Sequence, residues 1–362
     1  MAWIDHLNNV QQLVLFSAIK ILGVFAVTMT FIAYAVLAER KISAYIQDRV
    51  GPNRVALWGI SKIPVIGPFL TKLGIWQPIV DGVKSFLKED FTPAHVRKAY
   101  FWLAPAVIMI PALLVLAVIP FGSFLGNQKM VIADLNVGIL YTFGIVSLGV
   151  YGIVLAGYAS NSKYPFLGGI RSSAQMISYE IAMGMSVIPV FMMVGDLNLT
   201  QVINYQAHCW LIFKAPLSFV IFMVSAFAET NRLPFDLPES EQELVGGYHT
   251  EYSSMKFALF FMAEYANMIA ASGMMVTLFF GGWTLPFFGL DQPAHTIGMG
   301  IAHIGIFLAK IIVLMGVFIW VRWMWPRFRY DQLMDLGWRR FVPLSLANLL
   351  ATAVVLWLFS RH

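Results

Sequence analysis

Cysteine is nearly missing from this sequence of 362 residues, in which Cys209 stands alone. A single thiol excludes an internal disulfide and an iron–sulfur cluster held by cysteines of this chain. The GxGxxG, Walker and HExxH patterns are missing as well, and the histidines do not cluster at metal-ligand spacing. We therefore expect no cofactor and no metal in this chain, and any electron carrier to lie in another polypeptide.

Charge is also scarce. Charged residues make up 12% of the sequence and hydrophobic residues 59%, whereas soluble proteins carry about 25% charged residues. This composition excludes an ordinary soluble domain and indicates an integral membrane protein. The first ten residues, MAWIDHLNNV, have no basic region and no small-residue cleavage site. The first apolar run is therefore interpreted as a retained helix, and the bacterial inner (plasma) membrane is the expected location.

Eight apolar runs come close to the roughly 20 residues that a helix needs to cross a bilayer. We therefore expect an all-α polytopic membrane protein with eight transmembrane helices, which form a single integral membrane domain over residues 1–362. The expected spans are 13–38, 101–119, 137–158, 174–194, 210–228, 257–280, 297–321 and 341–359.

The basic residues predict the orientation of these spans. The connections after the first, third, fifth and seventh spans, with their flanking ends, hold 19 of the 24 lysines and arginines. Because cytoplasmic connections are enriched in Lys and Arg, we expect these four in the cytoplasm and both termini on the outer, periplasmic side. The net charge of +5 follows from this topology, so we expect no nucleic-acid partner.

The connection after the fifth span, residues 229–256, is unusually acidic for a loop between two membrane segments. Crowded carboxylates raise one another's pKa, so some of them exchange protons near neutral pH. The pattern therefore predicts proton handling at the cytoplasmic face. The carboxylates concerned are Glu229, Asp236, Glu239, Glu241, Glu243 and Glu251.

The first cytoplasmic loop, residues 39–100, begins with Glu39 at the point where the first span meets the headgroups. This carboxylate is either an interfacial anchor or a functional group. Apolar residues then recur at helical spacing from Trp76 to Leu87, with Asp81 and two lysines on the opposite face. The pattern predicts an amphipathic helix in the interface plane, which is either a surface anchor or a lip that admits an amphipathic, lipid-soluble molecule.

Ionisable residues also lie within the expected spans. Glu180 in the fourth span and Glu264 in the sixth would each cost about 2.5–3.5 kcal/mol to insert, so such carboxylates usually face a cavity or relay protons. The alternative is a buried structural carboxylate bonded to a neighbouring hydroxyl, such as that of Tyr179 or Tyr265. Lys310, deep in the seventh span, suggests a charge relay.

Four long segments in order carry a resemblance to a known family. They are ERKISAYIQDRVGPNR at 39–54, QPIVDGVKSFLKED at 77–90, SSAQMISYEIAMG at 172–184 and AETNRLPFDLPESEQELVGGYHTEYSSMKFALFF at 228–261. They resemble the H subunit (mitochondrial subunit 1) of proton-pumping NADH:quinone oxidoreductase, respiratory complex I. The resemblance spans nearly the whole chain.

The resemblance implies a membrane subunit that forms most of a quinone tunnel and begins a carboxylate path for proton translocation. Quinone is then the substrate, and it would enter from the lipid between the first span and the amphipathic helix. FMN and iron–sulfur clusters belong to partner subunits. The implied partners are the peripheral-arm subunits of the quinone site, small membrane-arm subunits and membrane lipids.

The resemblance also assigns roles to residues by motif. The tunnel and chamber would be bordered by Glu39, Arg40, Arg49, Asp81, Asp90, Arg232 and Phe235. The acidic coupling loop would contain Glu229, Asp236, Glu239, Glu241 and Glu243, and the proton path would include Glu180, Glu251, Glu264 and Lys310.

One segment departs from the family, and three other interpretations stay open. Between VGPNR and QPIVDG, around residues 56–75, this chain carries about a dozen additional residues rich in Pro, Gly and apolar side chains.

The same motifs also suit the homologous subunit of a membrane-bound hydrogenase or an F420-dependent dehydrogenase. A secondary proton-coupled transporter and a passive anchor are the remaining alternatives, although no internal repeat supports the transporter.

Overall fold

The computed structural model describes residues 9–56, 66–126, 128–237, 245–286 and 289–360. Most of the described chain is helical, as expected for an all-α membrane protein. Seven of the described segments are long and apolar enough to cross a bilayer. They contain α1 (Asn9–Ile46), α4 (Lys98–Leu114), α5 (Gly138–Ala159), α6 (Lys163–Val194), α11 (Ser254–Phe279), α12 (Ile297–Met324) and α14 (Val342–Ser360).

The fifth expected span differs from the prediction of one helix over 210–228. The structure instead has a short helix α8 (Leu211–Lys214) followed by α9 (Pro216–Glu229), which is 14 residues long. Pro216 has no backbone N–H to donate within a helix, so it is suited to the first turn of α9. The apolar run is therefore divided at Ala215, and α9 alone is shorter than the roughly 20 residues of a full crossing.

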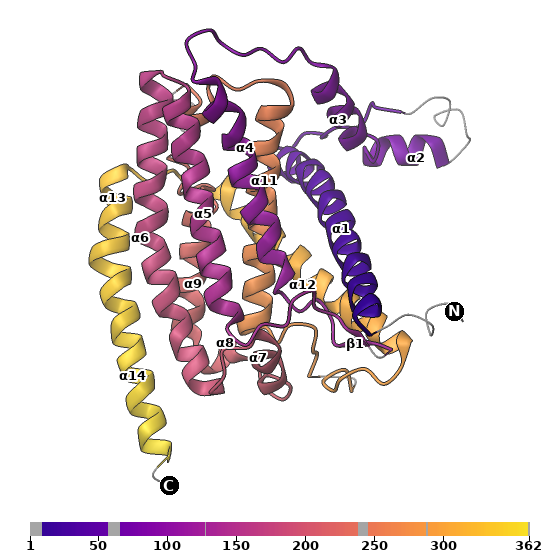
Figure 1. The fold of residues 1–362 in the computed structure, drawn as a ribbon, viewed down its shortest axis with the longest axis vertical. Coiled ribbons are helices and arrows are strands. Elements are labelled where there is room, and N and C mark those ends of the chain that lie inside the picture. Colours follow the sequence, from indigo (N-terminus) through magenta and orange to yellow (C-terminus); the bar gives the residue numbers. More distant parts are fainter. Residues whose placement is uncertain (1–8, 57–65, 127, 238–244, 287–288, 361–362) are drawn as a thin grey trace.

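The long helices lie side by side, and the chain passes back and forth between two ends of the molecule (Figure 1). The start of α1 and the end of α14 lie at the same end of the bundle. Helix α14 packs along the outside of α6, and α1 slants along the opposite side of the bundle. Both outer helices keep many apolar side chains exposed, as helices in contact with lipid or with other subunits do.

Small residues allow the central helices to approach each other closely. A Cβ on Gly152 of α5 would lie 2.3 Å from Ile108 Cγ1 of α4 and 2.9 Å from the Ile108 backbone nitrogen. A Cβ on Gly157 of α5 would lie 2.6 Å from the Pro165 carbonyl oxygen of α6. Because helices in lipid associate through close packing and not through the hydrophobic effect, these glycines position α4, α5 and α6.

The shorter elements lie at the two ends of the bundle. The helix α3 (Gln77–Leu87) covers the region in which the sequence predicts an amphipathic helix, so that helix is confirmed. Its apolar residues Val83 and Phe86 are 51% and 72% exposed, as an unpartnered apolar face requires. The other short elements are α2 (Ile66–Leu73), η2 (Val115–Ala117), β1 (Phe124–Leu125), β2 (Gln128–Lys129), α7 (Leu199–Tyr205), η3 (Gly247–His249), α13 (Tyr330–Asp335) and η4 (Leu336–Phe341).

Gly152→Leu is expected to force α4 and α5 apart, because the new side chain would overlap both the side chain and the backbone of Ile108. Overpacking of this kind costs about 1–3 kcal/mol or more. The expected result is a lower thermal midpoint of the purified protein and a lower yield of folded protein. Gly144→Leu on the same helix is the matched control, because a Cβ there meets no atom within 4 Å. Equal stability of the two variants would contradict the packing role of Gly152.

Candidate functional site

Arg232 is the centre of a buried cluster of charged residues. Its side chain is only 2% exposed, and it follows α9 in the acidic loop. Its Nη1 donates to both carboxylate oxygens of Glu39, at 3.3 Å and 3.1 Å. Its Nε lies 2.5 Å from Oε1 of Glu264. One guanidinium therefore joins the end of α1, the acidic loop and the middle of α11.

Two further residues complete this cluster. Arg322, near the end of α12, forms a short ion pair with Oε1 of Glu39. The Tyr265 hydroxyl donates to Oε2 of Glu39 at 2.5 Å, and the Tyr265 ring lies 4.5 Å from the Arg232 guanidinium carbon. We call these five residues, Glu39, Arg232, Glu264, Tyr265 and Arg322, the Arg232 cluster.

The charges in the Arg232 cluster balance. Two carboxylates face two guanidinium groups, which permits burial because an unpaired ion at such a site would be very costly. Burial alone lowers the pKa of Arg232, but the carboxylates of Glu264 and Glu39 raise it more. The pKa of Arg232 therefore lies above its ordinary value, and the guanidinium stays charged at every physiological pH.

The segment after Arg232 is held against α6 and the region after α12. Gln175 of α6 donates to the carbonyl oxygens of Ala228 at 2.7 Å and Phe235 at 2.8 Å. The Phe235 side chain is buried, and its ring centroid lies 5.4 Å from that of Tyr179. These contacts place the backbone on both sides of Arg232, so that its side chain enters the cluster in one orientation.

Asp236 forms a second buried ion pair close to the first. Its Oδ2 accepts a hydrogen bond from Nη2 of Arg327 at 3.1 Å. Burial raises the pKa of Asp236, and Arg327 and Arg322 oppose that rise without cancelling it. The pKa of Asp236 therefore lies above that of an exposed aspartate.

The first loop carries its own ion pairs. Arg40 of α1 pairs with Asp81 of α3 at 2.7 Å, which ties the amphipathic helix to the first span. Asp90 pairs with Lys256 at 3.0 Å, at the start of α11. Arg49 is exposed and donates to Gln47 at 2.7 Å. The pairs formed by Arg40, Asp81 and Asp90 are thus separate from the Arg232 cluster.

Ser254 binds the C-terminal end of α3. Its hydroxyl donates to the carbonyl oxygens of Ser85 at 3.0 Å and Lys88 at 2.9 Å. Nearby, His249 is buried, and desolvation lowers its pKa to about 4, so its ring is neutral at physiological pH. The end of the acidic loop is thus packed against the first loop and against α11.

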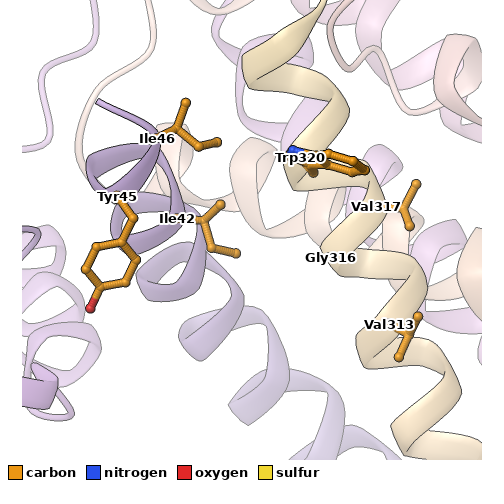
Figure 2. Close-up of a pocket in the computed structure, with 7 residues that line it drawn as sticks. All are labelled: Ile42, Tyr45, Ile46, Val313, Gly316, Val317 and Trp320. Carbon is orange, nitrogen blue, oxygen red and sulfur yellow. The ribbon is translucent and has the colours of Figure 1, made fainter. Parts of the chain in front are cut away.

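An apolar hollow of about 510 Å³ lies between α1 and α12 (Figure 2). Ile42 is three residues beyond Glu39 on α1, and Trp320 is two residues before Arg322 on α12. The hollow therefore lies on the same two helices as Glu39 and Arg322, but none of the five residues of the Arg232 cluster lines it. The lining residues are Ile42, Tyr45, Ile46, Val313, Gly316, Val317 and Trp320.

Glu180 and Glu229 form a separate acidic pair. They are close enough for the charge on Glu180 to act on Glu229. Glu229 also lines a cavity of about 40 Å³ with Thr142 of α5 and Asn267 of α11, and Glu264 and Glu229 line a neighbouring cavity of about 30 Å³. The smaller cavity is lined by several polar side chains, whereas the walls of the larger one are mostly apolar. The structure thus brings Glu264, Glu229 and Glu180 into one region of the bundle.

The remaining candidate residues lie elsewhere. Glu251 faces His95, with 3.9 Å between Oε2 and Nε2, in the loops outside the bundle. The Lys310 ammonium donates to the carbonyl oxygens of Phe280, Gly282 and Thr284 at 2.7, 2.9 and 2.7 Å. It satisfies the carbonyls at the C-terminal end of α11, far along that helix from Glu264. Glu239, Glu241 and Glu243 lie outside the described residues.

Sequence reasoning found three members of the Arg232 cluster but not how they connect. In the sequence, Arg322 is only one of the basic residues that predict topology. Tyr265 was the expected alternative partner of Glu264, but its hydroxyl binds Glu39 instead. The Tyr179 hydroxyl donates to the Leu333 carbonyl oxygen at 2.9 Å, so both tyrosine hydroxyls are directed to other acceptors. Among the described residues, no group of three or more His, Cys, Asp or Glu side chains is arranged to hold a metal ion.

Arg232→Met is expected to destabilise the protein strongly, because it leaves Glu39 and Glu264 buried with too little positive charge. Removal of one partner of a buried pair costs about 3–5 kcal/mol. Addition of Glu264→Gln to Arg232→Met should recover part of that loss, by about 0.5–3 kcal/mol, because it removes the unpaired charge. The thermal midpoint of the purified protein measures both effects.

Arg40→Met is the control for this comparison. The Arg40 side chain is 49% exposed and its partner Asp81 is 31% exposed, so its loss should cost at most about 1 kcal/mol. An Arg232→Met variant as stable as Arg40→Met, or a double variant less stable than the sum of its parts, would contradict the account of the cluster.

Comparison with known proteins places this geometry in a family. The family model described as NADH dehydrogenase matches residues 19–353. An NADH-quinone oxidoreductase H subunit of Cytophaga hutchinsonii is 46% identical over 356 residues, which cover 96% of this chain and 98% of that protein. The corresponding H subunit of Flavobacterium psychrophilum is 46% identical over 94% of this chain and 97% of its own length. An H subunit of Geobacter metallireducens is 47% identical over 94% and 96%. The chain therefore belongs to the family of NADH-quinone oxidoreductase H subunits.

Proposed function

We propose that this chain binds quinone at the inner end of α1 as the H subunit of an NADH-quinone oxidoreductase. The observation that carries the proposal is that one pair of helices, α1 and α12, carries both the apolar hollow and two members of the Arg232 cluster, Glu39 and Arg322, in a chain similar to these H subunits over nearly its whole length. A quinone has a polar headgroup and an apolar tail. The charged Arg232 cluster suits the polar headgroup, and the apolar hollow suits the apolar tail.

The membrane topology of the proposal follows the basic residues. Eight crossings place the Arg232 cluster and α3 at the cytoplasmic face and both termini on the periplasmic side of a bacterial inner membrane. The α9 helix would be the shortest crossing, completed by α8. Partner subunits of the membrane arm would cover part of the exposed apolar surface of α14, and the peripheral arm would carry FMN and the iron–sulfur clusters.

Quinone enters from the lipid along the inner part of α1 in this proposal. The expected route runs between the first span and α3. The hollow provides further apolar surface on the side of α1 that faces α12. The Arg40–Asp81 pair holds α3 against α1, so these two residues set the width of the passage. Asp90, paired with Lys256, fixes the loop beyond α3.

Reduction of the quinone to a quinol consumes two protons, and this demand is the proposed start of coupling. The four charges of the Arg232 cluster lie in a low-dielectric region, where a change in one charge shifts the others strongly. Glu39 and Glu264 share Arg232, so a proton gained by one weakens its hold on the arginine and changes the field at the other. Glu229 and Glu180 would carry that change farther into the bundle, past the two small cavities beside Glu229.

The redox chemistry belongs to partner subunits in this account. The residues of this chain bind the quinone, exclude water through the apolar hollow and hold charges around the headgroup. Glu251 and Lys310 lie outside the Arg232 cluster, so the proposed path passes through Glu264, Glu229 and Glu180 and does not require either of them. The acidic residues Glu239, Glu241 and Glu243 stay a predicted part of the coupling loop.

Gly316→Leu tests the hollow. A Cβ on Gly316 would meet no atom within 4 Å, so a leucine fills the hollow without a clash. The expected result is a fall of about tenfold in NADH-dependent reduction of a long-chain quinone, which corresponds to about 1.4 kcal/mol in the activation free energy. Electron transfer from NADH to an artificial acceptor of the peripheral arm should not change.

The Gly144→Leu variant is again the control, since it adds the same side chain to open space on α5. Assembly of each variant is checked on a native gel. Unchanged quinone reduction in an assembled Gly316→Leu complex would exclude the hollow from the quinone site, and equal losses in both variants would show a general effect of added bulk.

A further inference from the structure

A second apolar groove lies on the other half of α1, away from the Arg232 cluster. It has a volume of about 450 Å³, within the range of about 300–1,000 Å³ of pockets that hold small ligands. One wall is a stripe of α1 from Phe16 to Phe31. The opposite wall comes from Leu116 of η2, the segment that contains β1 and β2, and Phe307 and Ile311 of α12.

The groove is open to the membrane. Ile19 and Val27, which line it, are 56% and 48% exposed. Gly23 lies between them on the same stripe, and a Cβ there would meet no atom within 4 Å. The absence of a side chain at Gly23 therefore widens the groove at its centre, on the surface that faces lipid.

Lys20 alone carries a charge among the described side chains that line the groove. Its ammonium donates to the Val131 carbonyl oxygen at 3.3 Å. An ammonium has three N–H donors, so this contact leaves donors for a ligand. A lysine in an apolar membrane groove favours an anionic group over a neutral one.

The position of Lys20 along α1 matches the thickness of a bilayer. Lys20 and Glu39 are 19 residues apart, which is about 28 Å at 1.5 Å per residue, close to the roughly 30 Å of the hydrocarbon core. Glu39 lies where α1 reaches the cytoplasmic headgroups in the proposed topology, so Lys20 lies near the opposite headgroups. From Lys20 to Phe31 the groove extends about 16 Å, or roughly one leaflet.

We propose that this groove binds one acyl chain of an anionic phospholipid of the outer leaflet, with the lipid phosphate at the Lys20 ammonium. The acyl chain lies along the stripe of α1 past Gly23, and its end reaches Phe31 near the bilayer centre. The charge on Lys20 selects an anionic lipid over a quinone, whose headgroup is neutral. The site is distinct from the quinone site, because it occupies the other half of α1.

Retention of lipid by the purified complex tests this site directly. The whole complex is reconstituted in vesicles of equal parts phosphatidylglycerol and phosphatidylethanolamine, solubilised again and measured by native mass spectrometry. The wild-type complex should retain at least one phosphatidylglycerol more than the Gly23→Phe complex, because phenylalanine fills the groove. Gly144→Phe is the control and should retain lipid as the wild type does.

Lys20→Gln keeps the groove and removes the charge. The expected result is a fall of about tenfold in the retained ratio of phosphatidylglycerol to phosphatidylethanolamine, the ratio change that the loss of one charged contact of about 1.4 kcal/mol produces. This variant decides the question even if Gly23→Phe does not assemble.

Equal lipid retention in wild type and Lys20→Gln would overturn the proposal. Efficient cross-linking of a Gly23→Cys complex to a partner subunit would also overturn it, because a protein helix would then fill the groove. Neither readout uses quinone reduction, so failure of the lipid site and failure of the quinone site are distinguishable.

Discussion

The contacts of the Arg232 guanidinium are the interaction on which the arrangement of α1, the acidic loop, α11 and α12 depends. The guanidinium bonds Glu39, 193 residues away in the sequence, and pairs with Glu264 of α11. Arg322 of α12 also pairs with Glu39 and supplies the second positive charge of the cluster. Burial of four charges is tolerated only because they balance and bond one another, so the end of α1, the acidic loop, α11 and α12 must keep one arrangement.

This constraint connects structure with the proposed function. A cluster that is neutral as a whole, but contains two carboxylates that share one arginine, responds strongly to any proton or charge brought near it. The hollow between α1 and α12 lies on the two helices that carry Glu39 and Arg322, and the small cavities beside Glu229 lie among the neighbouring helices. A cluster with a fixed arrangement, in which the carboxylates can gain or lose a proton, suits the proposed coupling of quinone reduction to proton movement in the membrane.

Much of the fold could be predicted, because each apolar run and the helix α3 are local patterns of adjacent residues. The fifth run misled the prediction, since hydropathy ignores the effect of Pro216 on helix continuity. Glu264 could be singled out by the cost of charge in lipid, Glu39 by its place at the end of the first span and Arg232 by the family resemblance, but their pairing could not be predicted. That pairing depends on contacts between segments hundreds of residues apart, such as Arg322 with Glu39, 283 positions away. Lys310 binds backbone carbonyls near the end of α11, contacts that its place in an apolar run does not reveal, and its part in a charge relay stays a prediction.

Hydrogen exchange of the assembled complex, compared between wild type and Glu39→Gln, tests the central claim most directly. If Glu39 holds Arg232 and Arg322 in place, the backbone amides of residues 229–237 and the adjoining parts of α11 and α12 will exchange faster in the variant. Asp81→Asn, which removes the charge that pairs with Arg40 and does not touch the Arg232 cluster, should leave those amides protected. Unchanged exchange at residues 229–237 in Glu39→Gln would contradict the account, because the cluster would then not hold the acidic loop.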